Sequence, residues 1–384
     1  MKNILTINIL PLAPFFMIAF CSAYITQLTA FSPFYFAYFL ALIICLINII
    51  SKVSIPDLKS NNFTLLITLI IFFYYVIANC FWKQPNKLSY YFITILFNQF
   101  SLVITFYSLR INNQLNIKKM LIGYFYVSLF IGIWDFINRY INATNTFKGV
   151  LFFYNYKLSS IMFTDSNWVG FIYMIAFSFF IYIRERYGWI KRKIIFLFFI
   201  LVCLSFSRAA IISCVLIIFF NFIKKQQRSI RSFFLFLVCV CIFFSPFIIQ
   251  FLLNDDSFGT KMALLRGLDY YLHTASLTQL LFGNGMGVSS SDLALPLLGG
   301  IGYGGHLYLI LKIIDTGIVG LILELIFFLN IALITNGYFI YLFLPFFVCG
   351  LSMCPGNLSF MYVFGGLMMY LEGYKKTDGD NIWN

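Results

Sequence analysis

The stretch from Asn167 to Lys193, NWVGFIYMIAFSFFIYIRERYGWIKRK, contains the pattern that decides the fold of this chain. Seventeen uncharged residues, 167–183, precede a short cluster rich in Arg and Lys, and further apolar runs follow at 194–206 and 209–223. A helix needs about 20 mostly apolar residues to cross the hydrocarbon core of a bilayer. Apolar runs bounded by positive charges are therefore typical of membrane-spanning helices.

Runs of this kind recur from residue 4 to residue 371, so we expect an all-α integral membrane protein with about twelve transmembrane helices. We interpret 1–384 as a single polytopic domain, because no long polar segment separates a soluble unit and no internal repeat is visible. The first run has no small-residue cleavage site, which favours a retained span over a removed signal peptide. The predicted spans are 4–25, 31–50, 63–82, 89–109, 120–139, 167–183, 194–206, 209–223, 232–253, 306–329, 337–354 and 357–371.

The composition points the same way. The chain is 61% hydrophobic and 10% charged, whereas a soluble domain carries roughly 25% charged residues. Its 50 Phe and 25 Tyr would cover a water-facing surface with apolar patches. All nine cysteines lie in or beside apolar runs without disulfide-framework or metal-site spacing, so we interpret them as small hydrophobes.

The net charge of +13 would suggest a nucleic-acid partner in a soluble protein, but the positions of the charges give another explanation. With a cytoplasmic N-terminus, 17 of the 26 Lys and Arg residues fall on the cytoplasmic side, eight on the other side, and Lys312 within a span. This is the positive-inside pattern. It predicts that both termini are cytoplasmic, and it explains the basic residues as topology signals.

Two outer loops, at about 140–166 and 254–305, are longer than a connection requires, which is typical of functional loops. Within the second, Thr260–Phe282 has the spacing of an amphipathic helix. We expect its apolar residues to face the membrane surface or the protein; these are Leu264, Leu268, Tyr271 and Leu272. Two glycine clusters follow, at 283–287 and 299–305, where positive φ and close backbone approach are permitted.

Two arginines on the predicted outer side are candidate anion ligands. Arg208 sits between two apolar runs with almost no loop, and Arg266 sits in the middle of the second loop. A guanidinium group stays charged and offers a fixed fork of donors that matches phosphate oxygens. The alternatives are a snorkelling arginine at a tight turn for Arg208 and a solvated one for Arg266.

His306 opens the predicted span at 306–329, where it is a candidate general base or hydrogen-bond donor, or a helix cap. Asp165 and Asn167 precede the span at 167–183, and Asp/Ser/Asn clusters at such positions also serve as N-caps. Asp269, Asp315 and Glu324 complete the candidate list for the outer face.

Lys312, Asp315 and Glu324 lie within one predicted span. Charged residues at membrane depth are functional candidates by default. The alternative is a structural pair of Lys312 with Asp315, three residues away, which would leave Glu324 without a partner in its own helix. No Walker, HExxH, GxSxG or metal-ligand motif occurs, so no metal or cofactor is expected.

The order of these pieces resembles the O-antigen polymerase and O-antigen ligase superfamily over roughly residues 160–325. The similarity rests on short motifs whose order, spacing and predicted side agree with the family. They are DSNWVG at Asp165–Gly170, Ser207-Arg208, Leu265-Arg266-Gly267, LFGNGMG at Leu281–Gly287, HLYLIL at His306–Leu311 and DTGIVGL at Asp315–Leu321.

The resemblance implies a membrane glycosyltransferase with a fold like that of the GT-C class, at the periplasmic face of a bacterial inner membrane. It would be inverting and metal-independent, and it would use an undecaprenyl-diphosphate-linked glycan as donor. The implied catalytic residues are His306, Arg266 and Arg208. Substrate-binding roles would fall to Asp165, Asn167, Gly283, Gly285, Gly287 and Asp315, and a chain-length regulator protein would be an expected partner.

Leu307 stands where many members have Asn after the His, which favours the polymerase over the ligase that transfers glycan to lipid A–core. As a hypothesis, the amphipathic segment covers the site and excludes water. A twelve-span transporter or flippase of lipid-linked oligosaccharide is the alternative from another class, although the matching halves typical of many transporters are not visible. A scaffolding subunit is a further alternative, which the gathering of Arg and His on one side argues against.

Overall fold

The computed structural model describes residues 12–29, 31–50, 62–78, 82, 96–111, 116–144, 150–163, 166–225, 256–290, 292–300, 307–351 and 359–374. This described part of the chain is helical and contains no strand. The longer helices are α1 (Leu12–Phe20), α2 (Pro33–Ile50), α3 (Asn62–Ala78), α5 (Ser101–Ile111), α6 (Ile117–Thr144), α7 (Val150–Leu158), α8 (Ser166–Tyr187), α9 (Arg192–Leu204), α10 (Arg208–Lys225), α13 (Asp256–Thr274), α16 (Tyr308–Ile334), α17 (Ile340–Gly350) and α18 (Phe360–Tyr374).

Eleven of the twelve predicted spans coincide in part with a described helix, whereas the one at 232–253 lies outside the described residues. Three of these helices, α6, α8 and α16, are long and apolar enough to cross a membrane. The shorter apolar segments Pro33–Ile47, Phe63–Ala78 and Ile340–Gly350 accompany them. The 28 residues of α6 span about 42 Å at 1.5 Å per residue. This helix therefore exceeds a hydrocarbon core of roughly 30 Å and extends beyond it.

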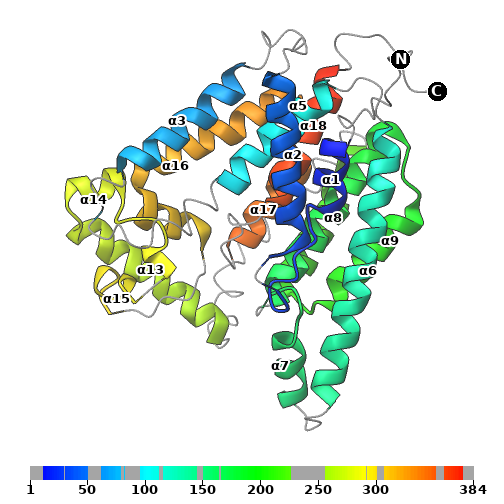
Figure 1. Ribbon diagram of the computed structural model, residues 1–384. Helices are drawn as coiled ribbons and strands as arrows, with labels where there is room; N and C mark the ends of the chain where they lie inside the picture. The colour runs from blue at the N-terminus through cyan, green and yellow to red at the C-terminus, as the bar shows by residue number, and fades with distance from the viewer. Residues whose placement is uncertain are drawn as a thin grey trace.

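Helix α8 is the centre of the bundle. It is buried along nearly all of its length, from Val169 to Ile183, and it packs against α9, α10 and α17. A helix that is apolar on every side is stable only when other helices or lipid surround it. In Figure 1, α6 and α7 flank this group on one side, α1 lies against the upper part of α6, and α2 packs against α1.

Helices α3 and α16 lie side by side on the opposite side of the molecule (Figure 1). Next to them is a lobe formed by α13, α14 (Leu277–Phe282), α15 (Ala294–Leu297) and the first half of α16. The lobe has an apolar cluster of its own, which contains Leu264, Tyr271, Val288, Ala294, Leu298, Ile310 and Ile314. The second outer loop of the sequence is thus a packed structure in its described part.

The amphipathic prediction for 260–282 is confirmed in outline and wrong in one detail, the continuity of the helix. The segment is helical, with Leu264 and Tyr271 buried and Leu268 packed against the cluster. Leu272 is exposed, so it does not contact this cluster, and its expected place at a membrane surface stays a prediction. The helix, however, stops at Thr274. A new helix, α14, begins after Ser276, because Ser276 and Gln279 form a reciprocal capping box.

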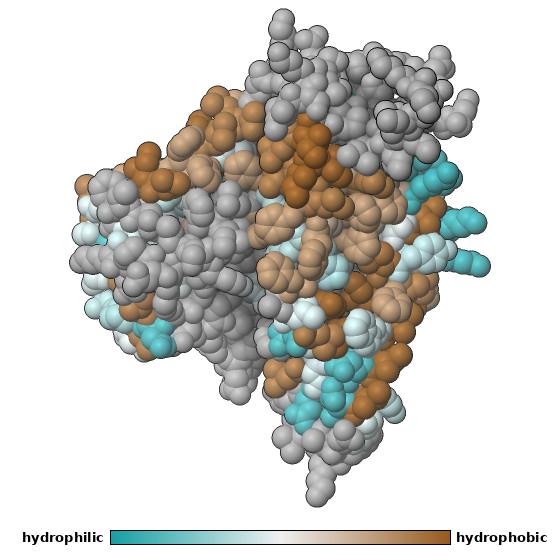
Figure 2. Space-filling view, viewed as in Figure 1, coloured by the Kyte–Doolittle hydropathy of each residue, from teal (hydrophilic) through white to brown (hydrophobic). Residues whose placement is uncertain are grey.

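Large apolar side chains cover much of the outer surface of the bundle. Phe130 on α6 is 67% exposed and Leu333 on α16 is 69% exposed. Figure 2 shows continuous brown surface over the upper part of the molecule. Such surface would drive aggregation in water but is favourable against acyl chains.

Candidate functional site

The sequence motifs assemble at two places, and the first is a break in α16. Gly317 has φ 68° and ψ −178°, which interrupts the helix in its middle. A break leaves backbone carbonyls without their usual partners, and these must be satisfied elsewhere. The backbone N–H groups of Asn284 and Gly285 donate to the carbonyls of Ile314 and Asp315, at 2.9 and 3.1 Å. The Tyr74 hydroxyl of α3 donates to the Thr316 carbonyl.

The glycine segment crosses this break in direct backbone contact. A Cβ atom on Gly283 would collide with the backbone of Asp315 and Thr316, and one on Gly317 would collide with the backbone of Leu281. Both glycines also have positive φ, at 78° and 68°, where side chains are unfavourable. We call Gly283, Asn284, Gly285, Asp315 and Gly317 the glycine crossing.

The Asn284 side chain joins the glycine crossing to the outer lobe. Its Nδ2 donates to the Tyr271 hydroxyl at 2.8 Å and to the Ile314 carbonyl at 3.1 Å, and its Oδ1 accepts from Gln279. Burial raises the pKa of Tyr271, so its hydroxyl keeps its proton and donates to the Gln279 carbonyl at 3.1 Å. Trp82 adds a hydrogen bond from Nε1 to the Phe282 carbonyl at 2.9 Å.

Asp315 has a backbone partner and no ion pair with Lys312. Its Oδ1 accepts from the backbone N–H of Ser289 at 2.8 Å, in the 3₁₀ turn η4 (Val288–Ser290). Lys312 instead pairs with Glu324, with Nζ 3.0 Å from Oε2, and both side chains are largely buried. The alternative of a structural Lys312–Asp315 pair is therefore wrong, and Glu324 does have a partner in its own helix. Residues twelve apart would lie about 18 Å apart along a straight helix, so the pair forms because α16 bends at Gly317 (Figure 1).

The second assembly joins the start of α8 to the start of α10. The Ser207 hydroxyl donates to Asn167 Oδ1 at 3.0 Å and accepts from the backbone N–H of Ala210 at 3.4 Å, which caps α10. A Cβ atom on Gly170 would lie 2.5 Å from Ser207 Cβ and 2.6 Å from Ser205 Oγ. We call Asn167, Gly170, Ser205, Ser207 and Arg208 the α8–α10 junction.

Arg208 is the first residue of α10 and is exposed at this junction. The turn before it is tight, because Phe206 adopts φ 54° and Ser205 Oγ accepts from the Ser207 backbone N–H at 3.2 Å. The N-terminus of a helix carries free N–H groups and a positive dipole end. The junction thus presents a cation and a helix N-terminus together, which suits an anionic ligand.

The other predicted residues have different surroundings. Arg266 is exposed on α13, on a different side from Leu264 and Tyr271. Asp269 is exposed as well, and its carbonyl lies 2.8 Å from His273 Nδ1, which makes it a surface residue of α13. Gly287 belongs to the segment that leads to Ser289, with φ 82°. His306 and Asp165 lie outside the described residues.

Sequence reasoning missed a buried ion pair in α6. Arg139 Nε donates to Asp135 Oδ2 at 2.7 Å, and the two side chains are 1% and 5% exposed. Asp135 Oδ1 also accepts from Ser160 Oγ at 2.7 Å and from the Ile161 backbone N–H at 2.8 Å. The prediction had placed Arg139 at the edge of an outer loop. The i, i+4 spacing of an acid and a base was the available signal.

Tyr156 extends this network to the α8–α10 junction. The guanidinium of Arg139 lies 5.6 Å from the centre of its ring. Its hydroxyl donates to the Leu204 carbonyl at 2.8 Å, and its ring contacts Phe206 in the turn before Arg208. Burial raises the pKa of Tyr156 to about 12, so the hydroxyl remains a donor. The buried pair in α6 therefore supports both sides of the junction, through Ile161 and through Tyr156.

Among the described residues, no group of three or more His, Cys, Asp and Glu side chains is arranged to hold a metal ion. A comparison with protein-family models and with curated proteins finds no match for this chain. The chemistry of the two assemblies is therefore the basis for assigning a function.

Proposed function

We propose that this chain is a membrane-embedded glycosyltransferase that joins undecaprenyl-diphosphate-linked repeat units into a surface polysaccharide. One observation carries the proposal. The motifs that resemble the O-antigen polymerase and ligase superfamily meet in pairs: Asn167 and Gly170 contact Ser207, and the Gly283–Gly287 segment contacts Asp315 and Gly317. Contacts between the matched motifs are what a shared site would require.

The proposed setting is the periplasmic face of a bacterial inner membrane. The chain would cross the membrane about twelve times, in an arrangement like that of the GT-C class, with both termini in the cytoplasm. The lobe of α13, α14 and α15 would belong to the periplasmic loop at 254–305. Its packing against the first half of α16 would let it cover the site and exclude water.

The proposed reaction is an inverting, metal-independent glycosyl transfer. A hydroxyl of the acceptor sugar attacks the anomeric carbon of the donor, the bond to the diphosphate breaks, and the hydroxyl proton passes to a base. In this proposal Arg208 and Arg266 stabilise the charge that develops on the leaving diphosphate. His306 is the proposed base, an assignment that rests on the resemblance alone.

The glycine crossing has a positioning role in this proposal. The carbonyls freed by the break are satisfied by Asn284 and Gly285, which fixes the segment that leads to Ser289 and holds Asp315 Oδ1. Gly283, Gly285, Gly287, Asn167 and Asp315 would line the substrate side, together with Asp165. A chain-length regulator protein would act on the same outer face.

The broken helix also favours a second candidate, a transporter of lipid-linked oligosaccharide. Discontinuous helices near the midplane bind substrates and ions in many transporters. At this break, however, the carbonyls of Ile314 and Asp315 already accept hydrogen bonds from Asn284 and Gly285. An ion site built on those carbonyls would have to compete with these bonds, so we favour the enzyme.

The test is the pattern of surface polysaccharide on a gel, in a deletion strain complemented with wild type, Arg208→Ala or Lys193→Ala. Lys193 is an exposed basic residue of α9 and serves as the matched control for loss of one positive charge. We expect the deletion to leave core carrying a single repeat unit. Wild type and Lys193→Ala restore the ladder, whereas Arg208→Ala fails to do so at equal expression.

Other patterns identify the rivals. Bare core with accumulated lipid-linked polymer would identify an O-antigen ligase. Loss of all polymer with repeat units retained on the cytoplasmic side would identify a flippase. An unchanged ladder in the deletion strain would rule the proposal out.

A further inference from the structure

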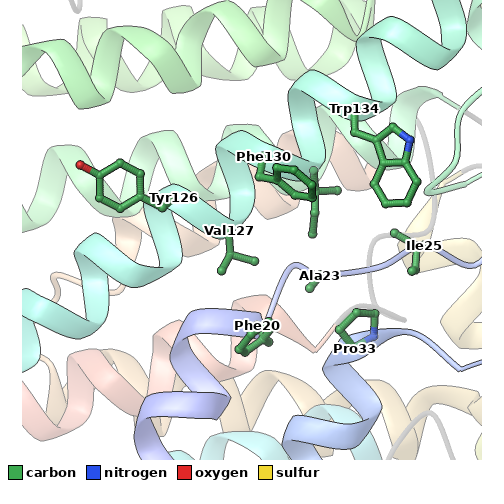
Figure 3. Close-up of a pocket in the computed structure, with 9 residues that line it drawn as sticks. Phe20, Ala23, Ile25, Pro33, Tyr126, Val127, Phe130 and Trp134 are labelled. Atoms are coloured by element: carbon green, nitrogen blue, oxygen red, sulfur yellow. The ribbon is translucent and has the colours of Figure 1, made fainter.

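An apolar groove of about 370 Å³ lies on the surface between the turn that follows α1, the start of α2 and one side of α6 (Figure 3). Ala23, Ile25 and Pro33 form part of one wall, and Tyr126, Phe130 and Trp134 form part of the other. An apolar cavity of about 150 Å³ stays dry and binds a benzene ring. This larger groove has room for a segment of a hydrocarbon chain.

The α6 wall of the groove faces outward from the bundle. Tyr126, Phe130 and Trp134 follow one another at four-residue intervals, so their rings form a row about 12 Å long on one side of the helix. Phe130 is the most exposed of the three, and α6 is a candidate membrane span. In the hydrocarbon region such a groove is filled by a lipid chain rather than by water.

One end of the groove lies next to the segment 160–163 and Asp135, which support the α8–α10 junction. Just beyond Ile25, Gln27 donates from its backbone N–H to the Ile161 carbonyl at 3.1 Å, and Thr26 donates to the Met162 carbonyl. Just beyond Trp134, Asp135 accepts from the Ile161 N–H at 2.8 Å. Both walls are therefore bonded to one segment, 160–163, which precedes α8 in the chain. Along α6, the polar end of the helix begins at Asp135, directly after the groove residue Trp134.

We propose that the groove holds the isoprenoid chain of the lipid-linked substrate, with the diphosphate at the α8–α10 junction beside Arg208. This inference rests on the proposed function, because that function supplies the substrate. The groove runs along the apolar part of α6 and ends beside Asp135 and the segment 160–163, which precedes α8, so the diphosphate end of the chain would lie toward the junction.

The test is photocrosslinking in nanodiscs of phosphatidylethanolamine and phosphatidylglycerol that contain undecaprenyl phosphate. The photoreactive residue p-benzoylphenylalanine replaces Phe130 in the groove or, as a matched control, Ile133 on the same helix. Ile133 is exposed but does not line the groove. We expect an undecaprenyl phosphate adduct by mass spectrometry at position 130, and phospholipid adducts alone at position 133.

Two groove-filling variants sharpen the test. Val127→Trp fills the groove from α6, and we expect it to abolish the undecaprenyl adduct at position 130 while phospholipid adducts persist. Ala23→Leu fills it from the opposite wall with a smaller side chain and serves if the first variant does not fold. Phospholipid adducts alone at position 130, or an undecaprenyl adduct that survives both substitutions, would overturn the proposal.

The result is separable from the proposed function. An undecaprenyl adduct at position 130 together with an unchanged polysaccharide ladder in the deletion strain would leave the groove assigned and the polymerase rejected. Loss of the ladder without an undecaprenyl adduct at position 130 would leave the polymerase standing and place the chain elsewhere. Arg208→Ala is expected to keep the adduct, because the groove holds the chain and not the diphosphate.

Discussion

The α8–α10 junction and the glycine crossing both depend on glycine, but for different reasons. Gly170 lies within α8 and allows this helix to approach the side chains of Ser205 and Ser207. Gly283 and Gly317 have positive φ and allow one backbone to lie directly on another. Side chains can rotate away from a new methyl group, whereas a hydrogen-bonded backbone can move only with its neighbours. The glycine crossing should therefore tolerate substitution less well than the junction.

The largest expected effect is at Gly317. In Gly317→Ala the new methyl group would collide with the backbone of Leu281 and Gly283, and residue 317 would keep its positive φ. We therefore expect the free energy of unfolding to fall by roughly 4 kcal/mol or more. Thermal unfolding of the purified protein in detergent measures this loss of stability. The matched control is Gly337→Ala, at φ 79° with no atom within 4 Å of the new methyl group. Equal losses in the two variants would show that φ strain alone matters and that the backbone contact does not.

The next effect concerns the ion pair that spans the break. Lys312→Met leaves Glu324 largely buried without its partner, so we expect a loss of about 3 kcal/mol in the free energy of unfolding. The double variant Lys312→Met/Glu324→Leu removes both charges and should recover most of that loss, as measured by the same unfolding experiment. A double variant no better than Lys312→Met would show that the ammonium acts through other contacts.

Gly170→Ala tests the contact between α8 and the side chains of Ser205 and Ser207, which can rotate to make room. The methyl group would lie 2.5 Å from Ser207 Cβ, and we expect overpacking to cost about 2 kcal/mol. Unfolding in detergent and the polysaccharide ladder are both measured, because a displaced Ser207 also displaces Arg208. The helical Gly123→Ala, where the nearest atom is an ordinary 3.6 Å away, is the control and should be near neutral. A larger loss at Gly170 than at Gly317 would reverse the comparison.

The smallest effect is at the cap of α10. Ser207→Ala removes the hydroxyl that caps α10 and donates to Asn167, at an expected cost of about 1 kcal/mol. Ser207→Thr keeps the hydroxyl and is expected to retain the polysaccharide ladder. If Ser207→Ala kept the ladder and Ser207→Thr lost it, crowding at Gly170, and not the hydrogen bond, would be the cause.

The helical segments could be predicted from the sequence because each depends on a local property, a run of apolar residues with polar ends. The glycine clusters likewise indicated that a close backbone approach is possible, but not that Gly283–Gly287 would lie on Asp315–Gly317. The Lys312–Glu324 pair could not be predicted in this way. It depends on a bend at Gly317, and a Gly inside an apolar run does not reveal whether the helix continues through it.

The buried pair in α6 shows another limit. Asp135 and Arg139 lie at the polar end of an apolar run, where charges usually face water. They are buried because α7 and the segment 160–163 fold back over them, with Ser160, Ile161 and Tyr156 as partners. Such partners come from elsewhere in the chain, so local pattern alone does not reveal them.

The bend in α16 also has a consequence for biogenesis. During synthesis α16 reaches the membrane before α17 and α18, and a lysine or an acid at the centre of a span raises the free energy of insertion by roughly 3 kcal/mol each. Lys312 and Glu324 belong to the same segment, so they can neutralise each other without help from any later helix. They meet only when the segment bends at Gly317. The glycine therefore lets Lys312 and Glu324 enter the bilayer as a neutral pair, before the rest of the bundle exists to accept their charges.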